Sequence, residues 1–187
     1  ASNTASGYRA LAANTCGNDN TAVGWSAMVS NTTGTHNVAI GRQALQTNTT
    51  GLYNTAVGKQ ALYYNSTGGY NTASGYRALF RNTTGADNTA MGKDAMYSNT
   101  TGSYNTTSGY RSLRANITGC FNTASGQYTL KDNTTGCYNS AHGAYALRRN
   151  TTGHSNTTSG YYALNQNTTG CASVAVGTHA LTSNTTG

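Results

Sequence analysis

The 187-residue sequence contains no proline and no glutamate, and only 8% of its residues are charged. Its four acidic residues are aspartates scattered along the chain, and its four histidines fall at unrelated places. An enzyme needs a base, a nucleophile and an orienting group that converge in one pocket. We therefore expect no enzymatic activity, no catalytic residues and no cofactor.

Long hydrophobic runs are also missing. No stretch approaches the ~20 apolar residues that span a membrane, so we expect no membrane partner for this segment. Low charge does not indicate disorder here, because the chain has 14 tyrosines and a large apolar residue in every repeat. The first and last repeats look like the others, without the atypical caps of a solenoid, so we expect the middle part of a longer protein or one segment of a filament.

What the sequence does have is a repeat of 17 residues, N-T-A-x-G-x-x-A-L-x-x-N-T-T-G-x-x, which fills the chain eleven times without remainder. A fixed period of this size is typical of a solenoid or array. We therefore treat residues 1–187 as a single array with no separate domains.

Each repeat predicts β-structure. Two glycines and several Asn and Thr residues per repeat disfavour a helix. The runs NVAIG (37–41) and NTAVG (54–58) predict short strands that end at glycine, GKQALYYN (58–65) predicts a second strand, and NTTG predicts a turn. The expected fold is all-β: a parallel β-solenoid, or β-roll, of eleven coils stacked ~4.8 Å apart into a rod of roughly 53 Å.

The positions of the repeat define columns along the rod. One column is always large and apolar and predicts a core ladder: Leu11, Met28, Leu45, Leu62, Leu79, Met96, Leu113, Leu130, Leu147, Leu164 and Leu181. Two columns of small residues, Ala5 to Ala175 and Ala10 to Ala180, indicate close packing. A mixed column, with Val23 and Ile40, predicts a partly exposed face or a subunit contact. One large side chain per coil makes a thin core, which favours a homo-oligomer.

An asparagine recurs in every coil, and two interpretations remain open. The column could form a ladder of side-chain amides, or it could carry glycans, because N-x-[S/T] is a glycosylation acceptor. Asn105 and Asn156 add two further acceptor patterns. The column positions that match the pattern are Asn31, Asn48, Asn65, Asn82, Asn99, Asn116, Asn133, Asn150, Asn167 and Asn184.

The column after the turn glycine holds Cys120, Cys137, His154 and Cys171 in successive coils. At ~4.8 Å per coil the outer pair lies about 14 Å apart, too far for one zinc ion, so we expect no metal site. Cys120 and Cys137 are neighbours, at a spacing that a disulfide accepts. We predict a bridge between them; the alternative is that all four cysteines are small side chains tolerated at a variable turn.

The net charge of +7 raises the question of a polyanion partner. Arg9, Arg77 and Arg111 share a column, but Gln43 and Asp94 also belong to it. A nucleic-acid groove needs a stripe of basic residues with aromatic residues beside it. We therefore expect scattered solubilising charge and no nucleic-acid partner.

The phrases NVAIG and SVAVG (173–177) resemble the head repeats of trimeric autotransporter adhesins, and the phrase at 53–79 resembles tandem repeats of phage tail fibres and bacterial surface fibres. The resemblance implies a trimeric β-roll that serves as an extracellular structural or adhesive segment, with copies of itself and a cell-surface glycan or receptor as partners. Two alternatives are a glycan-coated filament and an ice-binding or surface-binding solenoid. The second would use a threonine array: Thr15, Thr32, Thr49, Thr83 and Thr100.

Overall fold

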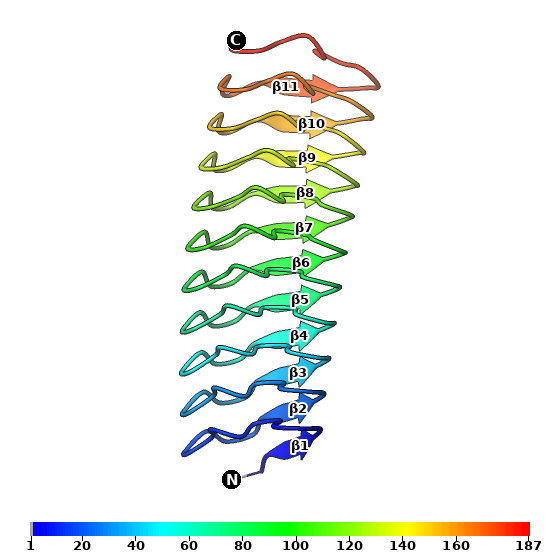
Figure 1. Cartoon of the computed structure of the whole chain (residues 1–187). Helices are drawn as coiled ribbons and strands as arrows, with labels where there is room; N and C mark the ends of the chain where they lie inside the picture. Colours follow the sequence, from blue (N-terminus) through cyan, green and yellow to red (C-terminus); the bar gives the residue numbers. More distant parts are fainter. Residues whose placement is uncertain (1) are drawn as a thin grey trace.

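The protein is a single β-solenoid in the computed structural model, which describes residues 2–187. Figure 1 shows one coil stacked on the next from the N-terminus to the C-terminus. Eleven parallel strands form one sheet in sequence order, so the predicted fold class is confirmed. The strands are β1 (Thr4–Ser6), β2 (Thr21–Val23), β3 (Val38–Ile40), β4 (Thr55–Val57), β5 (Thr72–Ser74), β6 (Thr89–Met91), β7 (Thr106–Ser108), β8 (Thr123–Ser125), β9 (Ser140–His142), β10 (Thr157–Ser159) and β11 (Val174–Val176).

The strand register repeats the sequence period. Thr72 pairs with Thr89 and Ala73 with Ala90, each 17 residues further on, and the same offset holds for every other pair of strands, from β1·β2 to β10·β11. No helix in the described residues is long and apolar enough to cross a membrane. Identical positions of the repeat therefore lie one above another along the rod.

The second strand expected at 58–65 is absent, because this segment consists of turns. Its backbone is nevertheless bonded to the neighbouring coils. In the matching segment of the next coil, the Leu79 N–H donates to Ala95 O at 3.0 Å, and the Arg77 N–H donates to Lys59 O at 3.1 Å. The coil thus remains connected on both sides without a regular strand.

Left-handed backbone conformation explains the missing strand. Arg77 and Leu79 have φ values of 55° and 50°, and the equivalent residues of every other coil are also left-handed. A third column, which includes Tyr70 at 58°, has the same conformation. Side chains branched at Cβ fit this region worst. The sequence agrees: these three columns contain no Val, Ile or Thr in any coil.

The first glycine of each repeat is required by geometry. Gly75 has a φ of 133°, which L-residues rarely adopt. A Cβ atom there would lie 2.7 Å from the carbonyl oxygen of Gly92 in the next coil. Gly69, in contrast, has no closer neighbour to such an atom than Leu52 O at 3.1 Å, and its column holds Ala86. The turn glycine is crowded as well, because a Cβ atom on Gly85 would overlap the carbonyl oxygen of Gly102. Both constant glycines of the repeat therefore depend on the absence of a side chain, whereas Gly69 does not.

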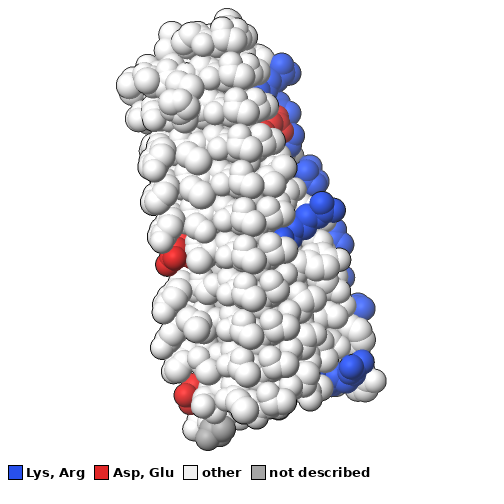
Figure 2. Space-filling view, turned by 90° about the vertical axis from the view of Figure 1, so that its left-hand side faces the viewer, with Lys and Arg blue, Asp and Glu red and all other residues white. Residues whose placement is uncertain are grey.

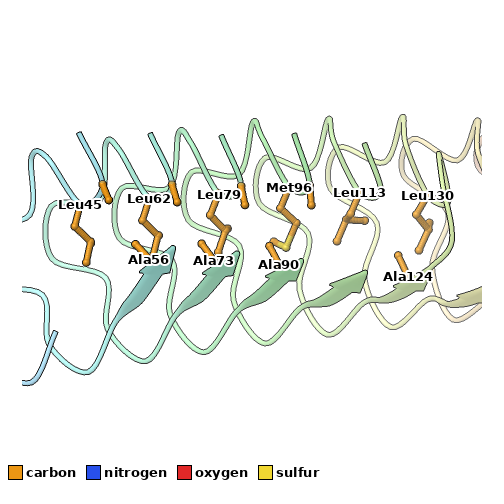
Figure 3. Close-up of a cluster of buried hydrophobic side chains, with 14 of the residues drawn as sticks. Leu45, Ala56, Leu62, Ala73, Leu79, Ala90, Met96, Leu113, Ala124 and Leu130 are labelled. Atoms are coloured by element: carbon orange, nitrogen blue, oxygen red, sulfur yellow. The ribbon is translucent and has the colours of Figure 1, made fainter. Parts of the chain in front are cut away.

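The predicted core ladder lies inside the coils. Figure 3 shows Leu45, Leu62, Leu79 and their successors in a row, facing the strand alanines. The nine ladder residues from Met28 to Leu164 are completely buried, whereas Leu181 in the last coil is 52% exposed. The alanine columns are buried as well, and two of their exceptions, Thr107 and Ser112, hydrogen-bond to each other within one coil. Each coil is therefore buried mainly by its neighbours.

Candidate functional site

The predicted asparagine column is a buried ladder of hydrogen bonds. The Asn82 Nδ2 donates to Asn65 Oδ1 at 2.8 Å and to Gly85 O at 2.9 Å, and its own Oδ1 accepts from Asn99 Nδ2 at 2.7 Å. Asn82 and its equivalents from Asn31 to Asn167 have no exposed surface. Because both amide hydrogens are used inside the coil, a glycan on these nitrogens is incompatible with the fold.

A second asparagine ladder precedes the strands, and the sequence analysis missed it. The Nδ2 of Asn88 donates to Asn71 Oδ1 at 3.1 Å and to Gly102 O at 2.9 Å. Gly102 O also accepts from Asn99 of the first ladder, so the two ladders share one acceptor per coil. The signal was visible, since this position is Asn in ten coils of eleven. Its members Asn105 and Asn156 are buried too, so they offer no glycan site.

The threonine column proposed for ice binding uses its hydroxyl hydrogens internally. The Thr32 Oγ1 donates to Thr49 O at 3.0 Å, and the Thr83 Oγ1 donates to Thr100 O at 3.0 Å. The side chains therefore close the turn between coils rather than presenting free donors to a ligand. The hydrogen bond to the next coil is a sufficient reason for a hydroxyl at this position, and no ligand on the surface is needed to explain it.

The predicted disulfide is absent, because Cys120 and Cys137 are both free thiols, as are Cys16 and Cys171. The Cys137 Sγ accepts the N–H of Cys120 at 3.1 Å, and the Cys120 Sγ accepts the N–H of Ser103 at 3.3 Å. The two thiols thus point the same way along the rod, each toward the backbone of the preceding coil rather than toward each other. In residues 2–187, no three His, Cys, Asp or Glu side chains lie close enough to hold a metal ion.

The basic residues gather on one edge of the rod, and here the sequence analysis was wrong. All eleven fall within the six residues that separate the first glycine of a repeat from the asparagine of the first ladder. Figure 2 shows them as one blue edge. The alanine and the leucine in the middle of this segment point inward, so the two residues on either side of them form the surface. We call this surface, residues 76, 77, 80 and 81 and their equivalents, the basic edge. Its basic members are Arg9, Arg42, Lys59, Arg77, Arg81, Lys93, Arg111, Arg114, Lys131, Arg148 and Arg149.

Aromatic rings fill the spaces between these cations. The guanidinium of Arg77 lies 4.9 Å from the ring centre of Tyr76 and 5.3 Å from that of Phe80. The Arg114 guanidinium lies 5.2 Å from the ring of Tyr97, and Phe80 and Tyr97 stack at 5.0 Å. Such contacts hold long cationic side chains in place while their charge stays near the surface.

The basic edge also contains two of the four aspartates. The Asp94 Oδ2 lies 3.6 Å from Arg111 Nε, and the Asp132 Oδ1 lies 2.9 Å from Lys131 Nζ. These pairs leave most of the edge cations without a carboxylate partner. Beside Arg111, the pKa of Tyr110 is raised above its ordinary value, first by its hydrogen bond to the Tyr128 side chain and then by burial. The Tyr110 phenol therefore acts as a neutral hydrogen-bonding group.

An open pocket of about 300 Å³ is hollowed into this edge, lined by Tyr64, Arg81, Thr83 and Thr100. Tyr64 is 46% exposed, and the Arg81 side chain is exposed too. The pocket thus combines a cation, a phenol and threonine side chains from consecutive coils.

The opposite edge has a different chemistry. Asp19 and Asp87 share the column that lies two residues after the turn glycine, and Figure 2 shows acidic side chains in red on the left of the rod, away from the blue edge. Between them and beyond, exposed rings of one column stack on each other, with Tyr53 and Tyr70 at 5.0 Å and Phe121 and Tyr138 at 5.1 Å. The column of Asp19 thus combines stacked aromatic rings with two carboxylates and contains no Lys or Arg.

In comparisons with known proteins, no family model, no curated protein and no solved structure matches the chain. The function is consequently argued from the structure alone.

Proposed function

We propose that the chain is a structural and adhesive segment of an extracellular fibre. The observation that carries this proposal is the contrast between a constant interior and a variable surface. Along the rod, the buried positions repeat as Ala, Ala, Leu or Met, and two Asn residues. The exposed positions differ from coil to coil: the column of Trp25 also contains Arg42, Gln127 and Ala144.

The interior explains why such a segment resists bending and unfolding. Two amide ladders and the core ladder run through the coils, and backbone hydrogen bonds join each coil to the next. In a solenoid the free energy of unfolding is approximately the sum of the stabilities of the single repeats and of the interfaces between neighbouring repeats. The rod can therefore be long although each coil contacts only the coils next to it. A support that holds variable side chains at fixed spacing suits adhesion.

We also propose that the fibre is a homo-oligomer, as a trimer of parallel chains, with the outer face of the sheet at the contact. In the first half of the rod this face carries Val23, Ile40, Val57 and Met91, each between 37% and 50% exposed. Serine takes the same position in other coils, as Ser74 does. The double variant Ile40→Ser, Val57→Ser therefore removes apolar surface from this face and introduces a residue that the fold already accepts at this position.

Two measurements test the proposal. Immunogold labelling of intact cells or particles that produce the protein should place the repeats on external fibres; label confined to the interior would refute the extracellular assignment. Light scattering coupled to size exclusion should give three chains for the native segment and fewer for the double variant. A native monomer would refute the oligomer and leave the fibre assignment to the labelling experiment.

A further inference from the structure

We propose that the basic edge binds an extended anionic polysaccharide whose chain lies along the rod axis. This inference deepens the proposed adhesive function and rests on it for the biological setting. It is carried by three observations on the described residues: the charge of the edge, its periodicity and the orientation of its aromatic rings.

The charge is continuous over the middle of the rod. Ten of the eleven basic residues lie in the seven consecutive coils from Arg42 to Arg149, and each of these coils contributes at least one. Arg42, Lys59, Arg81, Lys93 and Arg149 are exposed. A stripe of one sign attracts a polymer of the opposite sign and raises its association rate.

The periodicity favours a polymer over a small anion. Successive coils repeat the same surface at ~4.8 Å, so an extended chain meets an equivalent position at each coil. Once one unit of a polymer is bound, the next binds at a high effective concentration. Weak contacts at single coils can thereby add to a stable complex.

The aromatic rings favour a sugar over a nucleic acid. Single-stranded nucleic acids bind by stacking their bases on open ring faces. In the middle of the basic edge several of these faces are already covered: Tyr63 stacks on Phe80 at 5.2 Å, Phe80 stacks on Tyr97, and Arg77 lies over Tyr76. What remains outward are charged groups and phenol groups, which suit the carboxylates, sulfates and hydroxyls of an acidic polysaccharide.

The pocket supplies a place for one sugar unit. Arg81 can form charge-assisted hydrogen bonds to a carboxylate or sulfate. Tyr64 adds a phenol and a partly exposed ring to the pocket lining, and Thr83 and Thr100 complete it. A ligand that lies across this pocket touches the neighbouring cations of the edge at the same time.

The test is binding of the full 187-residue array to four probes: heparin, hyaluronan, neutral dextran and an oligothymidylate. We expect the array to bind heparin and hyaluronan, with an affinity that falls as salt is added. It should bind oligothymidylate more weakly than heparin, and it should show no binding to dextran. The variant Arg81→Gln, Arg114→Gln should weaken heparin binding about tenfold or more, since one lost hydrogen bond to a charged group already corresponds to about a tenfold factor.

The matched control is Ser155→Asp, Ala172→Asp, which lowers the net charge equally but on the opposite edge. Both residues are exposed, and their column already holds Asp19 and Asp87. Equal weakening by both variants would show nonspecific charge attraction and overturn the proposal. Tighter binding of oligothymidylate than of heparin would overturn it in favour of a nucleic acid, and absence of heparin binding would overturn it outright. The immunogold result is independent of these outcomes, so failure of the fibre assignment is distinguishable from failure of the ligand.

Discussion

The left-handed conformation of the core ladder predicts an unusual intolerance of isoleucine. Leu79 is completely buried and has a φ of 50°. Leu79→Ile keeps the volume and the apolar surface, and such a swap in an ordinary core costs below about 1.5 kcal/mol. Here the second branch on Cβ meets the backbone of the left-handed residue, and backbone strain of this kind adds roughly 1–3 kcal/mol. We therefore expect a total loss of about 2–4 kcal/mol.

Two control variants separate the backbone effect from packing. Leu79→Met should cost less than about 1.5 kcal/mol, because Met28 and Met96 already occupy the ladder at φ values of 49° and 47°. Val57→Ile introduces the same side chain in β4, where Ile40 stands in the same column, and it should leave stability nearly unchanged.

The assay is denaturant unfolding followed by far-ultraviolet circular dichroism. Because repeat arrays can unfold in parts, the midpoints of matched variants are compared rather than absolute free energies. The expected order of midpoints places Leu79→Ile well below Leu79→Met and Val57→Ile. If Leu79→Ile and Leu79→Met unfold at the same denaturant concentration, the ladder does not adopt the left-handed conformation and the reasoning fails.

Three further predictions concern the interior and the turn. Asn82→Asp should destabilise the array by about 3–5 kcal/mol. It buries a charge, and it replaces the Nδ2 donor by an oxygen that cannot donate to Asn65 Oδ1 and Gly85 O. The surface variant Thr84→Asp should change the thermal midpoint little. Gly75→Ala should prevent or strongly weaken folding, while Gly69→Ala, where the column already holds Ala86, should retain the native circular dichroism spectrum. All four cysteines should be alkylated in unreduced protein after unfolding; recovery of a peptide that links Cys120 to Cys137 would contradict the free-thiol arrangement.

The sequence was sufficient to predict the coil, the register and the core ladder. In a stack with a fixed period, one repeat determines the neighbours of every residue, so a column of Leu and Met next to columns of Ala defines the interior. The same reasoning placed the first asparagine ladder. It left the glycan alternative open because the pattern N-x-T does not reveal which way the amide points. Burial decides between the two, and Asn82 is buried.

The errors have separate physical causes. The expected strand at 58–65 was inferred from apolar character, although the leucine column and the column two residues before it lack Val, Ile and Thr, which already indicated left-handed residues. The cysteine prediction used Cα spacing and ignored the direction of the side chains. The basic residues seemed scattered because they occupy four columns, yet these columns share one surface around the buried alanine and leucine.

Folding does not require basic residues at that surface. In the coil of Trp25 and in the coil of Tyr161 none of the four positions of the basic edge holds Lys or Arg, and both coils have the same backbone bonds to their neighbours as the other inner coils. Other exposed columns, including the outer threonines such as Thr84, contain no Lys or Arg in any coil. A solubilising charge would serve equally well at those places. The backbone of the coil therefore does not require the confinement of all eleven cations to one edge, and the binding of an anionic polysaccharide that we propose would account for it.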